Sequence, residues 1–361
     1  MNKDLSRNDL IEKISELLKN ARNKVVSVVN QTIVLTYFEI GRMIVEEEQK
    51  GKERANYGQQ LLAEISQRLT SEFGKGFSKR NVEQMRQFYM TYAKAQTLSA
   101  LFEGNQITDS DLLTNKQQTL SSNSETQSRN FILSWSHYLK LMRIIDEEER
   151  NFYEIESYKN SWSLRELQRQ YDSALYTRLA LSKNKNKIRE LSTKGQVLEL
   201  PQDAVKDPYV LEFLGLEEHS EYSESDLEQK LIDRLEHFLL ELGTGFTFVA
   251  RQKRITFAEK HFKIDLVFYN RILKCFVIID LKIGELKHQD IGQMQMYVNY
   301  YDREIKLQDE NKTIGIVLCQ DKNEAVVQYT LPENNEQIFA SKYLTVLPNK
   351  ETLKQLLESQ Q

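Results

Sequence analysis

Two neighbouring apolar segments that each carry one aspartate constrain this chain most. Segments 264–269 and 275–281 are rich in Ile, Val, Phe and Tyr, and they contain Asp265 and Asp280 respectively. With turn-compatible Asn270 between them, they predict an antiparallel β-hairpin. An unpaired carboxylate in an apolar strand loses several kcal/mol of solvation. Two such acids need a physical reason, and a divalent cation near both of them would supply it.

The simplest register of this hairpin sets the two aspartates opposite each other. Its predicted pairs are Tyr269–Phe276, Val267–Ile278 and Asp265–Asp280. Cross-strand partners have Cβ atoms about 4.5–5.5 Å apart, where like charges repel unless a cation lies between them. Oxygen ligands of this kind select Mg²⁺ or Mn²⁺. The hairpin therefore predicts a metal site.

Lys282 follows Asp280 by two positions. Side chains alternate along a strand, so both residues point to the same face. A lysine there would orient or deprotonate a water, or neutralise charge on a phosphate. Taken alone, this spacing is far more typical of a solvated ion pair on an edge strand.

A helical pattern follows from about His288 to Tyr301. In it, Gln293 and Tyr297 are four residues apart and share one helix face. The pair would also suit the polar edge of an ordinary helix. Because the Gln293–Tyr297 pair follows the two acids and the lysine, it favours a catalytic site over a chance arrangement.

The order Asp … Asp-x-Lys … Gln-x-x-x-Tyr resembles the PD-(D/E)xK nuclease superfamily. The fuller strings FVARQKRI and IDLVFYNRILKCFVIIDLKIGELKHQDIGQMQMYVNYYD are similar to the bacterial YhcG-type family. Strings such as LSWSHYLKLMRI and SWSLRELQRQYDSALYTRLALS extend this resemblance over nearly the whole chain. It implies an α+β protein, with a mainly helical N-terminal region followed by a C-terminal α/β restriction-endonuclease-like domain with a mixed sheet.

The resemblance also implies roles for individual residues. The implied catalytic residues are Asp265, Asp280, Lys282, Gln293 and Tyr297. The implied ligands of Mg²⁺ or Mn²⁺ are Asp265, Asp280, the Leu281 carbonyl and Glu228. Glu224 and Glu236 lie near Glu228 and compete with it for the last position. The superfamily's proline before the first acid is absent, and Ile264 stands there.

The activity implied is metal-dependent phosphodiester hydrolysis of nucleic acid, with DNA as the expected substrate. Two alternatives stay open: a catalytically idle DNA-binding module within a larger complex, and an RNA-cleaving enzyme. The helical N-terminal region is expected to bind DNA or a partner, which includes a second copy of the chain in a homo-oligomer.

The charge balance by itself does not favour nucleic-acid binding. There are 49 Lys and Arg against 53 Asp and Glu, a formal net charge of −4, but local charge matters more than the sum. Basic clusters precede the first motif acid and recur in the helical regions. The candidates for phosphate contact are Arg251, Lys253, Arg254, Arg165, Arg169, Lys79 and Arg80.

Composition predicts four segments along the chain. Helical periodicity indicates an N-terminal domain over 1–100, in which the turn FGKGF and a cap at Ser78 are typical of either a helix-turn-helix or bundle packing. Residues 103–130 are dominated by Asn, Gln, Ser, Thr and Asp, which predicts a flexible connection. A basic helical segment over 131–200 and the nuclease domain over 222–347 follow.

Periodicity also predicts individual elements. The N-terminal apolar stripes predict separate helices around 10–18, 34–45 and 61–69. The C-terminal elements predicted are helix 226–241, strands 246–257, 264–269 and 274–282, helix 288–301, and strands 313–319 and 325–330. This C-terminal order is that of an α/β sandwich around a mixed sheet.

The two cysteines, Cys275 and Cys319, lie inside apolar runs and have no metal or disulfide spacing. No apolar run approaches the roughly 20 residues that span a bilayer, and the N-terminal residues lack a signal-peptide core. We therefore expect a cytoplasmic protein without a membrane partner.

Overall fold

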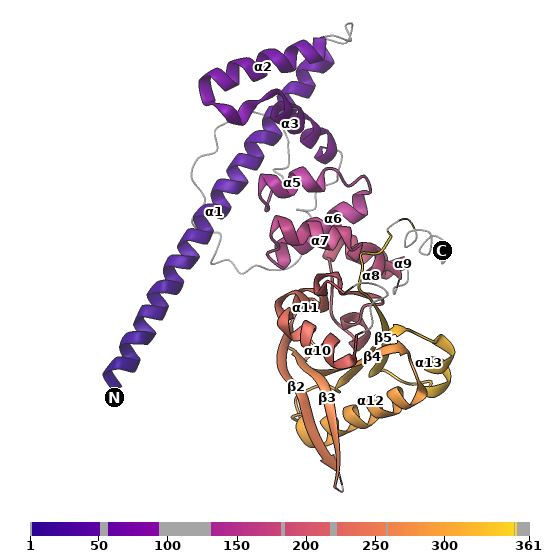
Figure 1. Ribbon diagram of the computed structural model, residues 1–361. Coiled ribbons are helices and arrows are strands. Elements are labelled where there is room, and N and C mark those ends of the chain that lie inside the picture. The colour runs from indigo at the N-terminus through magenta and orange to yellow at the C-terminus, as the bar shows by residue number, and fades with distance from the viewer. Residues whose placement is uncertain are drawn as a thin grey trace. The chain divides into compact units, whose positions relative to one another are not determined.

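The computed structural model describes residues 2–50, 57–93, 131–181, 185–216, 222–257, 259–349 and 351 (Figure 1). The chain forms two compact units, Met1–Leu167 and Gln168–Gln361. The predicted connection 103–130 lies outside the described residues. No described helix combines the length and the apolar character needed to cross a membrane.

A single helix of 49 residues, α1 (Asn2–Lys50), begins the N-terminal unit. Separate helices were predicted around 10–18 and 34–45, and this prediction was wrong because no proline or turn sequence interrupts the segment between them. Gly41 lies where α1 meets a neighbouring helix, since a Cβ there would collide with the Met85 carbonyl. The glycine thus permits close helix packing.

The other described helices of this unit are α2 (Tyr57–Phe73), η1 (Lys75–Phe77), α3 (Lys79–Tyr92), α5 (Trp135–Leu141) and α6 (Glu147–Lys159). Of these, α2, α3 and α5 contact α1. The predicted cap at Ser78 is confirmed, because its side chain accepts a hydrogen bond from the Asn81 N–H. The buried face of α3 packs on α1, with the rings of Phe38 and Phe88 5.8 Å apart. Bundle packing accounts for this face.

Helix α7 (Leu164–Asp172) crosses the boundary between the units, and the second unit continues with further helical segments. These are α8 (Leu175–Leu181), α9 (Lys185–Lys194), η2 (Pro201–Ala204), η3 (Glu212–Leu214), α10 (Glu224–Asp233) and α11 (Leu235–Leu242). The predicted helix 226–241 is therefore two helices, which break at Arg234.

A six-stranded sheet forms the centre of the C-terminal unit, in the order β1-β6-β5-β4-β3-β2. The strands are β1 (Tyr209–Val210), β2 (Phe246–Phe257), β3 (Lys260–Asn270), β4 (Cys275–Glu285), β5 (Ile314–Asp321) and β6 (Ile338–Leu344). Strands β2, β3 and β4 are antiparallel, whereas β4, β5, β6 and β1 are parallel. The predicted mixed sheet is confirmed.

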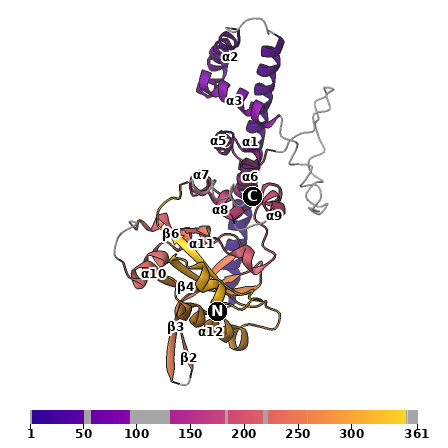
Figure 2. The same cartoon turned by 90° about the vertical axis from the view of Figure 1, so that its right-hand side faces the viewer.

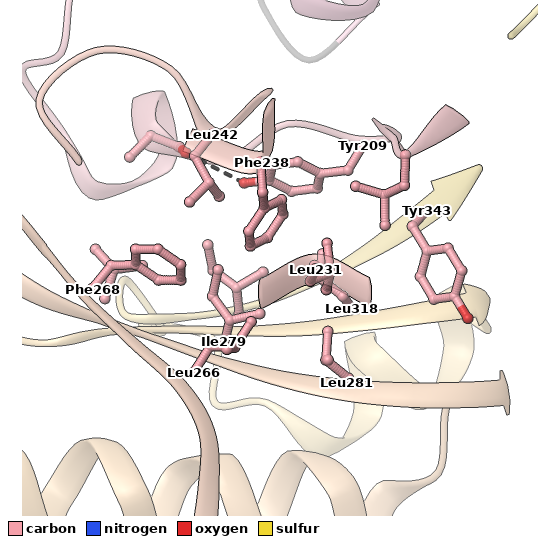
Figure 3. Close-up of a cluster of buried hydrophobic side chains, with 14 of the residues drawn as sticks. Tyr209, Leu231, Phe238, Leu242, Leu266, Phe268, Ile279, Leu281, Leu318 and Tyr343 are labelled. Carbon is pink, nitrogen blue, oxygen red and sulfur yellow. Dashed lines mark hydrogen bonds between the residues drawn. The ribbon is translucent and has the colours of Figure 1, made fainter. Parts of the chain in front are cut away.

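Helices cover both faces of this sheet. Helices α10 and α11 lie on one face, where their apolar side chains meet those of the strands (Figure 3). The residues labelled there include Leu231, Phe238, Leu242, Leu266, Phe268, Ile279, Leu281 and Leu318. Helix α12 (His288–Tyr300) covers the other face, and Figures 1 and 2 show β2 and β3 as a long hairpin that projects past the sheet.

The predicted strand 325–330 is wrong, because α13 (Glu324–Thr330) is a helix. The side chain of Asn323 caps it by accepting hydrogen bonds from the N–H groups of Ala325 and Val326. None of its residues is buried, so the β-favouring valines gain nothing from sheet packing. The prediction omitted β6, which completes this side of the sheet.

A buried ion network holds α8 and α11 together. Glu241 is fully buried, and its carboxylate accepts hydrogen bonds from Arg178 at 2.7 Å and from the Val210 N–H at 2.9 Å. Arg169 lies 3.3 Å from Glu241 and 2.8 Å from Glu212. The network thus satisfies charges that would be costly to bury alone.

Candidate active site

The candidate site lies where β3 and β4 separate. The predicted pairs Val267–Ile278 and Tyr269–Phe276 are confirmed, but the ladder ends at Leu266–Ile279, one residue before the aspartates. Beyond that point β4 continues beside β5 alone. The structure therefore has a fork in the sheet at the position predicted for the acids.

Asp265 fills the fork with its own side chain. Its Oδ2 accepts a hydrogen bond of 2.8 Å from the Leu281 N–H of β4. A backbone N–H at a strand edge must find an acceptor, and here a carboxylate replaces the carbonyl of a neighbouring strand. Asp265 is half-buried, whereas Asp280 is only 1% exposed.

Asp280 and Lys282 point to the same face, as predicted. They stand opposite Val317 and Cys319 of β5, which belong to the core beneath α12. The Lys282 Nζ lies 2.9 Å from Asp280 Oδ2 and 3.6 Å from a carboxylate oxygen of Glu224. Lys282 is thus held between a strand carboxylate and a carboxylate of α10.

Glu228 is the α10 glutamate linked to the first acid through the side chain of Gln252. The side-chain amide of Gln252 donates to the Glu228 carboxylate and lies 3.4 Å from Asp265 Oδ1. Arg251 approaches Glu228 at 3.1 Å. Of the two competitors, Glu224 contacts Lys282 instead, and Glu236 is exposed.

Gln252 is a site residue that the motif analysis missed. Its φ of +47° is in the left-handed region, which costs a non-glycine residue on the order of 1–3 kcal/mol. The β2–β3 pairs Arg251–Leu266 and Lys253–Ile264 place Gln252 beside Asp265. A predicted β2–β3 register would have placed Gln252 beside Asp265, but no sequence motif includes this residue.

Burial and mutual repulsion shift the titration of the two acids. Burial and the Asp280 charge raise the pKa of Asp265 to about 7. Burial also raises the pKa of Asp280, although Lys282 opposes the change. The pKa of Lys282 is lowered by burial but raised more by Asp280 and Glu224, so it lies above its ordinary value. Lys282 is therefore the cation of an ion pair with Asp280.

Gln293 and Tyr297 form a hydrogen-bonded pair on α12. Gln293 Nε2 donates to the Tyr297 hydroxyl at 2.8 Å, and that hydroxyl donates to the Lys263 carbonyl of β3 at 2.9 Å. Burial, followed by the Asp280 charge, raises the pKa of Tyr297 to about 12. The pair connects α12 to β3 two residues before Asp265, which fixes the first acid in place.

Two buried carboxylate oxygens in this site retain unused acceptor capacity. Asp280 Oδ2 and Glu228 Oε1 each face a cation, yet neither accepts a hydrogen bond from any described residue. Such oxygen donors suit a hard divalent ion. Within the described ranges, no three His, Cys, Asp or Glu side chains converge closely enough to hold one as they stand. Lys282 and Arg251 instead balance the negative charge, and Gln252 donates a hydrogen bond to Glu228.

The predicted phosphate-binding residues differ in their surroundings. Arg251 lies at the site, and Lys253 and Arg254 are exposed on β2 nearby. Lys79, Arg80 and Arg165 are exposed in the N-terminal unit. Arg169 is enclosed in the Glu241 network with a side chain only 13% exposed, so it does not face solvent as that role requires.

Known proteins match both units of the chain. The YhcG PDDEXK nuclease domain profile matches residues 202–358, and the DUF1016 N-terminal domain profile matches residues 13–178. The Escherichia coli (strain K12) protein named "Putative nuclease YhcG" is 40% identical over 356 residues, which cover 94% of this chain and 90% of that protein.

Solved structures match the chain over a smaller part. A repair endonuclease from Pyrococcus abyssi is 18% identical with a TM-score of 0.25, over 35% of this chain and 49% of that one. EndoMS bound to double-stranded DNA is 16% identical with a TM-score of 0.25, over 37% and 51%. The chain thus spans about half the length of these two. By its sequence, the chain belongs to the YhcG family and joins a DUF1016 N-terminal domain to a PDDEXK nuclease domain.

Proposed function

We propose that this protein is a Mg²⁺- or Mn²⁺-dependent nuclease that hydrolyses phosphodiester bonds in DNA. The observation that carries this proposal is the grouping of Asp265, Asp280 and Lys282 at a fork in the sheet, with Glu228 beside them. Membership of a family with a PDDEXK nuclease domain supports it. We also propose a cytoplasmic location, which the free thiols of Cys275 and Cys319 support.

Asp265, Asp280, Glu228 and the Leu281 carbonyl would hold the cation. When bound, it supplies Lewis-acid polarisation of the phosphate and a more acidic attacking water. Lys282, which ion-pairs with Asp280, would donate hydrogen bonds that position the water and stabilise charge on the phosphate. Gln293 and Tyr297 would hold β3 against α12 through the hydrogen bond to the Lys263 carbonyl.

Plasmid DNA incubated with Mg²⁺ or with EDTA tests this proposal. We expect cleavage only with Mg²⁺, and its loss in Lys282→Ala. Lys312→Ala, which changes an exposed lysine of the same unit, is the matched control. Full activity of Lys282→Ala would reject the assignment. Binding without cleavage would favour the idle module, and cleavage of matched RNA alone would favour the ribonuclease.

We also propose that α1 pairs with α1 of a second copy of this chain. Its N-terminal part exposes aliphatic side chains at heptad spacing, on residues that step alternately by four and three positions. These are Ile14 at 48% exposure, Leu18 at 56%, Val25 at 63%, Val28 at 52% and Leu35 at 42%, with Ala21 and Thr32 between them. This spacing keeps one seam facing a partner helix over several turns.

The energy available from this seam is comparable to the cost of association. The five side chains are 42–63% exposed, so burying the rest of each contributes about half of the 1.5–3 kcal/mol of full burial, or roughly 8–16 kcal/mol from two chains in gross terms. Association costs on the order of 4–15 kcal/mol before other losses. A second copy is the occupant that supplies the same heptad spacing.

Light scattering of the full chain tests this pairing. We expect a dimer, and a monomer after the double change Val25→Glu and Val28→Glu. Ser27→Glu adds a charge on the same turn but outside the seam, and it should leave the dimer intact. A monomeric wild type would contradict the pairing.

A further inference from the structure

The outer face of α12 forms one wall of a cavity of about 710 Å³. Lys260 and Phe262 of β3 also line it. Gly292, Asn299 and Tyr300 line it from α12. Arg303 lines it from η4 (Tyr301–Ile305), a π-helical turn. Such turns are rare and often accompany functional sites.

Gly292 lies inside α12, where glycine makes a helix less stable than alanine does. Its backbone does not require glycine, because its φ is not positive. A Cβ at this position would meet no heavy atom of the described residues within 4 Å. Packing within the protein therefore does not explain the residue, whereas close approach of a ligand to bare backbone does.

The lining has the chemistry of a nucleotide site. Phe262 and Tyr300 are half-buried aromatic residues of the kind on which bases stack. Asn299 offers an exposed amide that can donate to and accept from a base edge. Lys260 and Arg303 are exposed cations suited to phosphates. The one acidic lining residue, Glu304, leaves a positive excess of one charge.

The cavity is lined from β3, the strand that also carries Asp265. Phe262 is three residues from Asp265, which is about 10 Å at 3.3 Å per strand residue. Lys263, between them, accepts the Tyr297 hydrogen bond that ties β3 to α12. A strand whose phosphate lies at the acids would therefore pass this cavity.

We infer that this cavity binds an unpaired nucleotide of the substrate strand, close to the phosphate that is cleaved. This inference rests on the proposed nuclease function and names its substrate class. Stacking on side chains requires a base that has left the double helix. The expected ligand is thus single-stranded DNA, or a duplex that opens near the site.

Gly292→Leu in a Lys282→Ala background tests the inference by binding alone. Leucine favours the helix, so the melting temperature should stay the same or rise, while the side chain fills the cavity. We expect at least tenfold weaker anisotropy binding of a fluorescein-labelled single-stranded oligonucleotide in EDTA. Gln308→Leu, which changes an exposed residue of the same unit outside the cavity lining, is the matched control.

Arg303→Gln provides a second test that does not alter helix packing, with Lys312→Gln, at an exposed lysine of the same unit outside the cavity lining, as its control. Weaker binding should follow only from the arginine change. Unchanged binding in both Gly292→Leu and Arg303→Gln would overturn the inference, as would equal affinity of the parent for single strands and blunt duplex. Cleavage by the wild type, measured separately with Mg²⁺, shows whether the nuclease proposal stands when this inference fails.

Discussion

Strand β4 and the N-terminal part of α1 are both rich in valine and isoleucine, yet their surroundings differ. Val277, Ile278 and Ile279 of β4 have no exposed surface, whereas Val25 and Val26 of α1 are 63% and 59% exposed. In β4 the informative residue is therefore the buried acid, and in α1 it is the exposed hydrocarbon. The same residue type points to a core in one place and to an interface in the other.

The largest expected effect is at the candidate active site, where Asp265 of β3 contacts β4. Asp265→Asn should lower Mg²⁺-dependent cleavage by on the order of 10³-fold, as removal of one stabilising group does elsewhere. The folded-state pKa of Asp265 is raised, so its ionised form disfavours folding at pH 8 but not near pH 4. The variant should therefore be more stable than the wild type at pH 8, by roughly 1–3 kcal/mol, and similar near pH 4. Urea unfolding at both pH values checks this, and a less stable variant at pH 8 would contradict it.

Glu241→Gln should destabilise the C-terminal unit by about 3–5 kcal/mol, because it leaves Arg178 buried without its counter-charge. Burial raises the pKa of Glu241, but Arg178, Lys206 and Arg169 lower it by more, to about 2. Its contribution is present above pH 4.5 and is lost as the pH falls from 4.5 towards 2. Acid titration of the unfolding free energy should show this loss in the wild type and not in the variant. Glu236→Gln, an exposed change, is the control.

The metal requirement should depend on pH. Cation binding needs ionised Asp265, and with a pKa of about 7 this carboxyl is mostly protonated at pH 6 and mostly ionised at pH 8. The Mg²⁺ concentration for half-maximal cleavage should therefore be about tenfold higher at pH 6. A requirement that stays flat over this range would place the first acid outside the metal site.

Tyr297→Phe should have a smaller effect. It removes the hydroxyl that connects α12 to β3, at a cost of about 1 kcal/mol for the hydrogen bond. Cleavage should fall several-fold without a change in Mg²⁺ dependence, since the tyrosine positions Asp265 and does not hold the metal. A shifted Mg²⁺ optimum would indicate direct contact with the ion instead.

The smallest effect belongs to α1. Val26 is exposed and lies outside the heptad seam, so Val26→Ser should change the unfolding free energy by less than about 0.5 kcal/mol. Ile278→Ala, at a fully buried position, should cost about 2–5 kcal/mol. If both variants lost a similar amount of unfolding free energy, Val26 would have to be buried against a partner.

The sequence was sufficient for the hairpin register, because alternation and turn position leave few ways to pair β3 with β4. It was insufficient where tertiary packing decides. The conformation of Gln252 depends on two neighbouring acids, and Arg169 is enclosed by glutamates 43 and 72 residues away. The helix α13 formed in place of a predicted strand because an asparagine cap outweighed weak β-propensity.

The hydrogen bond from Leu281 to Asp265 has a consequence for how this site can decay. The first acid also substitutes for a missing strand neighbour, so alanine there would leave a backbone donor unsatisfied while asparagine would not. A descendant released from catalysis is therefore expected to discard the lysine freely, yet to retain an oxygen acceptor at this position. Pseudoenzymes of this lineage should be recognisable by an Asn in place of the first Asp.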